Sequence, residues 1–295
     1  MSVELVPITL AICSNRPSLL PNVIQSSIGL LGPDDRILVV MDGIPVAPDF
    51  GILPPAMTVI ANNTNRGLAH SRNRVLKECV TRLVIFLDDD IVATREAVEC
   101  ARAALSRGAD VIGARITADF QSCRPPWFLS AGQLHYLGSH SPITPVSIWG
   151  GFLGMDIERI RLLGVDFDER LGRTAGTLGS AEDTTFVRTL VSRGGQQEVL
   201  PGVEVRHLIP ASRLRLAYLL RRAFWQGRSE HRRHAVRGGL RKEWSRNWQA
   251  GCSTPRRATL TALFGAVVVA GVVCEALADG YRRQHPNMSR PSGSR

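Results

Sequence analysis

The first 113 residues alternate short apolar runs with segments of helical periodicity, and this alternation limits the folds open to the chain. Three segments are predicted to be helices: one that follows the first apolar run and ends at about Leu31, and the segments Leu68–Val80 and Glu96–Ser106, where apolar residues have helical spacing. The apolar runs that predict strands are Ile8–Cys13, Arg36–Met41, Met57–Ala61, Leu83–Leu87 and Ala109–Gly113. Continuous apolar strands between helices are typical of a parallel sheet covered on both faces. We therefore predict an α/β fold with a mostly parallel sheet.

The remainder of the chain is less regular. A stretch rich in Pro, Gly, Ser and His, from about Phe120 to Ser147, predicts a long loop. We expect a strand over Val146–Trp149, a helix over Ser180–Arg193 and a last strand over Val203–His207. These elements complete a catalytic domain over 1–212. Residues 213–295 then form a basic, helical extension that contains the apolar segment 258–274, with a disordered tail from Met288.

Polar side chains come directly after four of the predicted strands, namely Asn15, Asp42, Asn62 and Asp88. In an open parallel sheet, the carboxyl ends of the strands meet at one edge, and ligands bind outside that edge. One such residue carries little weight, because Asn and Asp end strands in most proteins. Four in register predict a polar binding site.

The run Asp88-Asp89-Asp90 follows a buried strand. Three adjacent carboxylates repel each other unless a cation or strong donors compensate. A divalent cation with oxygen ligands does so, and Mg²⁺ or Mn²⁺ is typically held by one or two carboxylates together with substrate phosphates. The alternative is a solvated acidic turn that caps the helix around Glu96.

Glu182 and Asp183 begin a predicted helix shortly after Ser180. A carboxylate here can act as a general base that deprotonates a hydroxyl acceptor. The alternative is structural, because Ser180-x-x-Asp183 resembles a capping box and acids are stabilised in the first turn of a helix.

Two further features have a binding and a structural interpretation. Trp149-Gly150-Gly151 offers an aromatic face for a sugar ring and backbone that a ligand can approach closely, or else a tight turn beside a core tryptophan. His207 ends the last strand. A lone histidine is more often structural, although histidine is the commonest metal-binding side chain.

The formal net charge of +10 is concentrated between Arg206 and Arg257, where tryptophans are interleaved with arginines. Such a stretch suits an anionic membrane surface, suits nucleic acid, or is a solvated helical face. The 17 uncharged residues of Ala258–Cys274 are marginal for a membrane span, and Glu275 follows at once. We expect this helix to pack on the protein or to lie in a membrane interface.

The six cysteines form no CxxC pair, and Cys13, Cys79 and Cys100 lie in apolar segments, which indicates buried free thiols and a reducing compartment. The N-terminus shows no signal-peptide pattern. A cytoplasmic protein, peripheral at the inner face of the cell membrane, is expected.

The order of the motifs resembles glycosyltransferase family 2, whose members have the GT-A fold. Its opening strand and Asn-Arg turn are similar to Ile8–Arg16, its Asp-Asp-Gly site to Val39–Gly43, and its N-x-G-x-x-x-x-R-N stretch to Asn65–Arg74. Its DxD element matches Phe86–Asp90, and its acceptor half resembles Gly150–Gly172 with Glu182-Asp183. The resemblance covers about Pro7 to Ser229. Ser14 stands where the family often has Tyr, and Met41 replaces an acid.

This resemblance implies roles for particular residues. Asp183 would be the base, with Glu182 beside it, and Trp149, Gly150 and Gly151 would lie on the acceptor side. Asp88, Asp90 and His207 would hold the metal, with Asp90 the stronger ligand. The donor pocket would be lined by Asn15, Arg16, Asp42, Arg72 and Asp89.

The function expected from these features is a metal-dependent, inverting transfer of a hexosyl group. The donor would be a nucleoside diphosphate sugar, with a UDP-sugar favoured. The acceptor would be a hydroxyl group of a glycan, a lipid-linked molecule or a small molecule. A nucleotidyltransferase is the alternative enzyme, although Ile12–Leu19 lacks a Gly-rich phosphate loop. A non-enzymatic membrane- or nucleic-acid-binding protein would explain the basic region but not the acids at the strand ends, and we expect no nucleic-acid partner.

Overall fold

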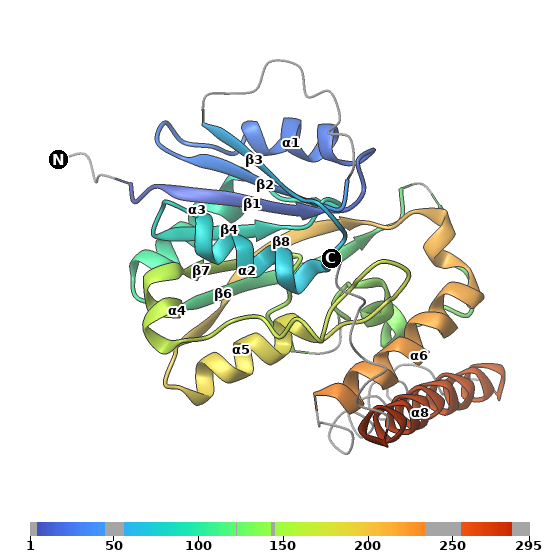
Figure 1. Cartoon of the computed structure of the whole chain (residues 1–295). Helices are drawn as coiled ribbons and strands as arrows, with labels where there is room; N and C mark the ends of the chain where they lie inside the picture. The colour runs from blue at the N-terminus through green and yellow to red at the C-terminus, as the bar shows by residue number, and fades with distance from the viewer. Residues whose placement is uncertain (1–4, 45–55, 122, 143–144, 234–254, 285–295) are drawn as a thin grey trace.

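The computed structural model describes residues 5–44, 56–121, 123–142, 145–233 and 255–284. Its centre is a mixed eight-stranded sheet in the order β3-β2-β1-β4-β7-β6-β8-β5, with helices against it (Figure 1). The strands are β1 (Ile8–Ser14), β2 (Arg36–Asp42), β3 (Met57–Asn62), β4 (Leu83–Leu87), β5 (Ile91–Val92), β6 (Val111–Asp119), β7 (Phe152–Asp156) and β8 (Gln197–Leu208). The helices are α1 (Leu20–Ile28), α2 (Leu68–Glu78), α3 (Arg95–Ser106), α4 (Ile157–Leu163), α5 (Glu182–Ser192), α6 (Leu216–Arg232) and α8 (Pro255–Gln284), with 3₁₀ helices η1 (Ala131–Leu137) and η2 (Ala211–Leu214).

The two faces of the sheet bury separate apolar clusters, because successive side chains of a strand point to opposite faces. On one face, strand residues such as Leu10 and Val39 pack with Leu20 of α1 and Val98 of α3. On the other face, Val84 and its neighbours pack with residues of α2, α4 and α5. The predicted α/β fold with helices on both faces is confirmed.

The predicted strands of the first half form a parallel set, since β1 pairs with β2 and β4, and β2 pairs with β3, all in parallel. Asn15, Asp42 and Asp88 therefore come to one edge, as the sequence pattern indicated. β7 pairs antiparallel with β4 and β6, and the short β5 pairs antiparallel with β8, whereas β6 and β8 are parallel.

The strand expected over Val146–Trp149 is wrong, because β7 begins at Phe152. The apolar character of the earlier segment has another cause. Ile148 is buried, and it packs onto Gly113 of β6, where an added Cβ would lie 3.0 Å from the isoleucine side chain. The long loop that precedes it also contains η1.

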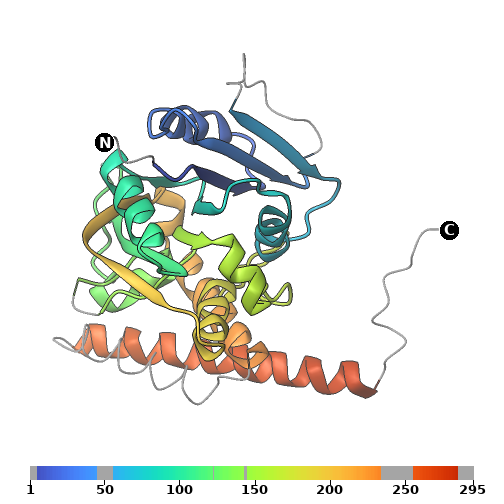
Figure 2. The ribbon, with the colours of Figure 1, turned by 90° about the vertical axis from the view of Figure 1, so that its left-hand side faces the viewer.

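A third apolar cluster joins η1 to α6 and α8 through Tyr136, Leu219, Phe264 and Val268. Tyr136 stacks on Phe264 with 5.3 Å between ring centroids. In Figure 2, α8 runs along one side of the molecule next to α6. The expected C-terminal helices are present as α6 and α8 among the described residues, and they pack with η1.

The α6–α8 contact is close because a glycine lies at it on each helix. A Cβ on Gly227 would lie 1.9 Å from the carbonyl oxygen of Val268, and one on Gly271 would lie 2.0 Å from that of Phe224. Ala258–Gln284 has the length and composition to cross a membrane, with a mean hydropathy of 2.2 and 28% of its most apolar window buried. One such helix is weak evidence for a span.

Candidate active site

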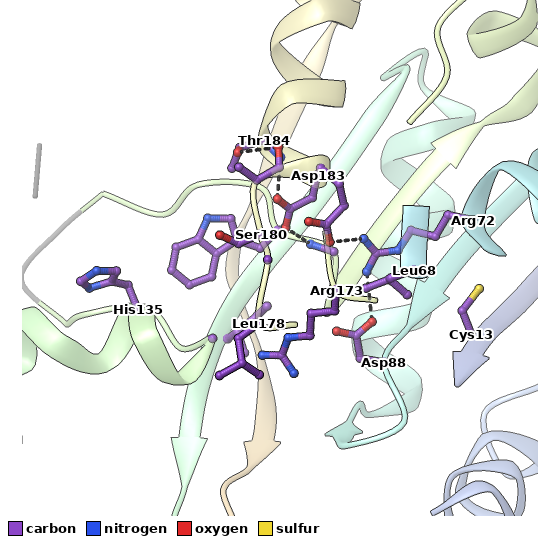
Figure 3. A pocket seen from close by; sticks show the side chains of 18 of the residues that line it. Cys13, Leu68, Arg72, Asp88, His135, Arg173, Leu178, Ser180, Asp183 and Thr184 are labelled. Atoms are coloured by element: carbon purple, nitrogen blue, oxygen red, sulfur yellow. Dashed lines mark hydrogen bonds and ion pairs between the residues drawn. The ribbon is translucent and has the colours of Figure 1, made fainter. Parts of the chain in front are cut away.

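A pocket of about 830 Å³ opens at the carboxyl ends of β1, β2 and β4. The donor-side candidates Asn15, Arg16, Asp42, Arg72 and Asp88–Asp90 line it, and so do Trp149–Gly151, Glu182, Asp183 and His207. The structure therefore brings every candidate site residue of the sequence to one cavity. Figure 3 shows Asp88, Arg72 and Asp183 from three different elements converging there.

Each carboxylate of the acidic turn has a different partner. Asp88 accepts a hydrogen bond from Arg72 Nη2 at 3.1 Å and is about one-third exposed. Asp89 is buried and accepts from Ser14 Oγ and from two nitrogens of Arg16. This turn does not cap the next helix, since Thr94 caps α3 by accepting from Ala97 N at 3.1 Å. The acidic-turn capping alternative is therefore wrong.

Asp90 is the most heavily paired of the three. Arg16 Nη2 and Arg213 Nη2 each lie 2.9 Å from its Oδ2, and His207 Nε2 lies 3.2 Å from its Oδ1. Burial alone would raise the pKa of Asp90. The hydrogen bond from His207 and the charges of His207, Arg213 and Arg16 outweigh burial and hold that pKa well below its usual range. For Asp89, burial dominates and raises the pKa despite Arg16.

The oxygen and nitrogen atoms of Asp90 and His207 are of the kinds that coordinate a divalent cation. Asp90 Oδ1 and His207 Nε2 lie 3.2 Å apart, while Asp88, on the same turn, is partly exposed and paired with Arg72. No group of three or more His, Cys, Asp and Glu side chains converges within the described part of the chain. Mg²⁺ and Mn²⁺ need only one or two carboxylates when substrate phosphates complete the shell. Arg213 contacts both of these side chains, since its Nη1 lies 3.1 Å from His207 Nε2 and its Nη2 lies 2.9 Å from Asp90 Oδ2.

Arg72 links the acidic turn to the acceptor side. Its side chain is 1% exposed, and its two terminal nitrogens donate to Asp88 Oδ1 and Glu182 Oε1, each at 3.1 Å. The guanidinium also lies over the rings of Phe86 and Phe167. A buried arginine between two carboxylates and two aromatic faces is fixed in place. Both of its ends are therefore engaged before any ligand arrives.

Glu182 and Asp183 occupy different environments at the start of α5. Glu182 is 6% exposed, and its pKa is raised to about 7 by burial and by the neighbouring Asp183 charge, against the charge of Arg72. Asp183 is half-buried and accepts from Gly150 N at 2.8 Å and from Thr184 N at 2.6 Å. These two bonds orient its carboxylate and leave lone pairs on both oxygens.

The capping-box alternative for this helix is wrong. Ala181 is the N-cap residue, with φ of 76°, and no side chain caps the helix. Ser180 instead donates its hydroxyl to Gln226 Oε1 at 2.9 Å, and its backbone N–H donates to Ser229 Oγ at 3.1 Å. The sequence pattern suggested a local cap, whereas the structure uses Ser180 to hold α6 against the pocket.

The remaining candidates have their own partners. Asp42 is buried, and its carboxylate accepts from Asn62 Nδ2, Arg66 N and Gly67 N, all at 2.8 Å. It therefore fixes the turn that leads into α2 as well as lining the pocket. Trp149 stacks on His140 with 3.9 Å between ring centroids, which sets the plane of the indole at the pocket wall.

Gly150 and Gly151 allow close approach, but the group that approaches Gly150 belongs to the protein. A Cβ on Gly150 would lie 2.2 Å from Arg72 Nη2. A Cβ on Gly151 would meet Ile116 at 3.1 Å and Ile91 at 3.3 Å. The first glycine makes room for the buried arginine, and the second for the apolar layer beneath.

Sequence reasoning missed the pocket arginines contributed after residue 170. Arg173, Arg213 and Arg222 all line the cavity, although two of them lie in the extension predicted to begin at residue 213. No spacing rule marks these residues, because they reach the pocket from a loop, η2 and α6. Arg213 and Arg222 belong to the basic stretch, so the local excess of charge was the available signal.

Comparison with known proteins bears on these observations. Residues 10–159, which are half of the chain and include the acidic turn and Trp149–Gly151, match the model for glycosyl transferase family 2. The chain belongs to glycosyl transferase family 2. It is therefore a glycosyltransferase, and the nucleotidyltransferase and non-enzymatic alternatives are excluded.

Solved structures of similar fold were also found. A mannosyltransferase, PcManGT from Pyrobaculum calidifontis in complex with GDP-Man and Mn²⁺, is 15% identical with a TM-score of 0.51, over 98% of this chain and 76% of that one. S. aureus TarS 1-349 is 14% identical with a TM-score of 0.49, over 96% of this chain and 75% of that one. No curated protein sequence matched the chain. The family 2 chain thus shares the GT-A architecture of PcManGT.

Proposed function

We propose that this family 2 enzyme transfers a hexosyl group from a nucleoside diphosphate sugar to a hydroxyl acceptor, with inversion at the anomeric carbon. The observation that carries the proposal is the arrangement around Arg72. One buried guanidinium joins Asp88 of the acidic turn to Glu182, directly beside Asp183. Groups suited to a diphosphate and a group suited to activating a hydroxyl thus face the same pocket.

Asp183 is the proposed base. It is more accessible than Glu182, and its carboxylate is oriented by the Gly150 and Thr184 amides while keeping free lone pairs. It would accept the acceptor's proton as that oxygen attacks the anomeric carbon and the diphosphate leaves. Glu182, held on Arg72 and largely removed from solvent, would position the arginine and shape the local charge.

On the donor side, Asn15, Arg16, Asp42 and Arg72 are proposed to line the nucleotide pocket, with Asp89 near the donor ribose or phosphates. A Mn²⁺ or Mg²⁺ ion held by Asp88, Asp90 and His207 would neutralise charge on the diphosphate leaving group. Arg16 and Arg213 already form ion pairs with Asp90. We favour a UDP-sugar as donor. PcManGT was solved with GDP-Man and Mn²⁺, so a GDP-sugar is the second donor to test.

Trp149 and the two glycines after it are proposed to line the acceptor side, where the indole face can pack on a sugar ring. We also propose that the enzyme works in the cytoplasm, held peripherally at the inner face of the cell membrane. The apolar outer face of α8 supports this placement.

A screen of nucleotide sugars for thermal stabilisation, with and without Mn²⁺, tests the donor and the metal together. A ligand that binds the folded state raises the melting temperature by mass action, so the correct donor should stand out. Asp90→Ala should remove the Mn²⁺-dependent part of the shift and abolish transfer while leaving the fold intact. Full activity in EDTA, or in the Asp90 variant, would show that the metal proposal is wrong.

A further inference from the structure

Eight arginines line the pocket, and they differ in pairing and in burial. Arg222 is 6% exposed, its Nη1 donates to the carbonyl oxygen of Leu178 at 2.7 Å, and its Nε is buried without a hydrogen-bond partner. Within the described residues, no carboxylate forms an ion pair with the guanidinium of Arg222 or with that of Arg173. By contrast, four other arginines that line the pocket are each paired with Asp or Glu, namely Arg16, Arg72, Arg213 and Arg233. The remaining two, Arg188 and Arg221, also lack an ion pair among the described residues, but both are exposed to solvent.

A buried guanidinium without a counter-charge is unfavourable, and Arg222 shows the expected response. Burial, and next the charge of Arg173, lower its pKa to about 10, so it stays charged at neutral pH. Burying a charge without a partner costs free energy, and an anion that arrives beside it removes that cost. Binding of an anionic group beside Arg222 is therefore favoured.

The location of the pair connects it to the acceptor side. Arg173 projects into the cavity that Asp88 and Asp183 also face (Figure 3). The charge of Glu182 acts on Arg222, which places this arginine near the acidic pair at the start of α5. Arg222 comes from α6, whereas Arg173 comes from the loop that leads to α5.

We propose that Arg173 and Arg222 bind a phosphate group of the acceptor, so that the enzyme glycosylates a phosphate-bearing molecule. This inference rests on the proposed function, because it assigns the chemistry of the acceptor at the same pocket. Guanidinium groups bind phosphate through charge-assisted hydrogen bonds, and two of them suit a doubly charged group. The phosphate belongs either to a soluble ester or to a lipid headgroup.

The test measures binding of glycerol 3-phosphate, with chloride at matched ionic strength as reference, by calorimetry. A second arm uses vesicles that contain phosphatidic acid, with neutral phosphatidylcholine vesicles as reference. Both arms are run with and without UDP and Mn²⁺, so that phosphate bound at the donor site is separated from phosphate bound at the arginines. The variants are Arg173→Gln, Arg222→Gln and the conservative Arg222→Lys.

Arg221→Gln is the matched control, because Arg221 also lines the pocket without a carboxylate partner but is exposed on the same helix, and it donates to the carbonyl oxygen of Gly176 at 2.8 Å. It separates the buried pair from the general positive charge of the pocket rim. Loss of a charge-assisted contact should weaken binding of the phosphate probe about tenfold or more in both glutamine variants, with partial recovery in Arg222→Lys. The control should change it less than about twofold. Arg173 is only half-buried, so its variant stays informative even where Arg222→Gln does not fold.

The two arms and the reaction itself give separable outcomes. Binding of the soluble ester that weakens in Arg173→Gln and Arg222→Gln supports a soluble phosphorylated acceptor. Binding of phosphatidic acid vesicles alone that weakens in these two variants supports a lipid-linked one, whereas vesicle binding that is unchanged in both variants would overturn the proposal. Phosphate binding no stronger than chloride binding, or equal loss in Arg221→Gln, would overturn the proposal. A failure of the proposed function would appear differently, as the absence of nucleotide-sugar binding and turnover in the unmodified enzyme.

Discussion

Glu182 and Asp183 at the start of α5 have different hydrogen-bond partners and burial, and we therefore propose different roles for them. Asp183→Asn should keep donor binding but lower turnover by about 100-fold or more, the typical loss when a general base is removed. Gly150 N and Thr184 N donate to different oxygens of Asp183, so the single amide oxygen of asparagine can accept only one of these bonds, and the melting temperature should fall modestly while the fold is kept. Steady-state kinetics and a melting curve on the same sample measure both. A near-normal rate would leave Asp183 with a purely structural role.

The raised pKa of Glu182 makes stability depend on pH in a defined direction. Its folded-state pKa of about 7 lies above the ordinary value of 4.5, so the contribution is fully present below pH 4.5 and is lost as pH rises through 7. The free energy of unfolding should fall across this window by at most about 3 kcal/mol. Urea unfolding at several pH values should show a flatter profile for Glu182→Gln. Parallel profiles would contradict the assignment.

At the scale of single elements, the turn before β7 has a glycine, Gly150, where any side chain would collide with Arg72. Gly150→Ala would place a Cβ 2.2 Å from Arg72 Nη2, so the arginine must move from Asp88 or Glu182. We expect transfer to fall by about 100-fold or more, because misplacing catalytic groups by about 1 Å costs that much. Gly151→Ala is the matched control, since its contacts of 3.1 Å and longer are with the flexible ends of isoleucines. Equal losses in both variants would argue against the arginine as the cause.

Local pattern was enough to predict the elements of the first half and the edge where Asn15, Asp42 and Asp88 meet. Each of these positions follows a strand directly, so a sequence rule carries their geometry. β7 could not be predicted in the same way, because Ile148 is buried by packing on Gly113 rather than by strand pairing.

The ion pairs of the pocket arginines could not be predicted from the sequence either. Arg213 meets Asp90 across 123 residues of sequence, and Arg72 meets Glu182 across 110. Contacts of this range depend on the fold as a whole and leave no local periodicity.

At the scale of the whole molecule, α8 presents two unlike faces. Thr261, Phe264, Val268, Gly271 and Glu275 are buried at alternating spacings of three and four, while large apolar residues on the outer face are exposed, namely Leu263, Val269, Val273 and Leu277. Glu275 is fully buried and paired with Arg228, Arg232 and Arg282. Insertion of α8 across a membrane would break the two pairs with Arg228 and Arg232 of α6, since Arg282 lies on α8 itself. The arrangement favours a helix that lies on a surface.

We therefore expect the protein to bind anionic membranes peripherally and to leave them in concentrated salt or carbonate. Each Lys or Arg near such a surface contributes about 1 kcal/mol, and salt screens it. Val273→Glu should weaken attachment, while Val80→Glu, at a site 79% exposed outside α8, should not. Cell fractionation followed by salt and detergent washes measures this. Retention until detergent is added would show a true span, and a wholly soluble protein would mean that α8 only packs on the catalytic domain.

The glycine contact between α6 and α8 joins backbone to backbone, with no side chain between to absorb a displacement. Arg222 lies five residues, little more than one turn, before Gly227 on the same helix. Anything that captures α8 would therefore also fix the orientation of the pocket. An enzyme tethered in this way searches for its acceptor in two dimensions instead of three, and the effective concentration of an acceptor confined to the same surface rises accordingly.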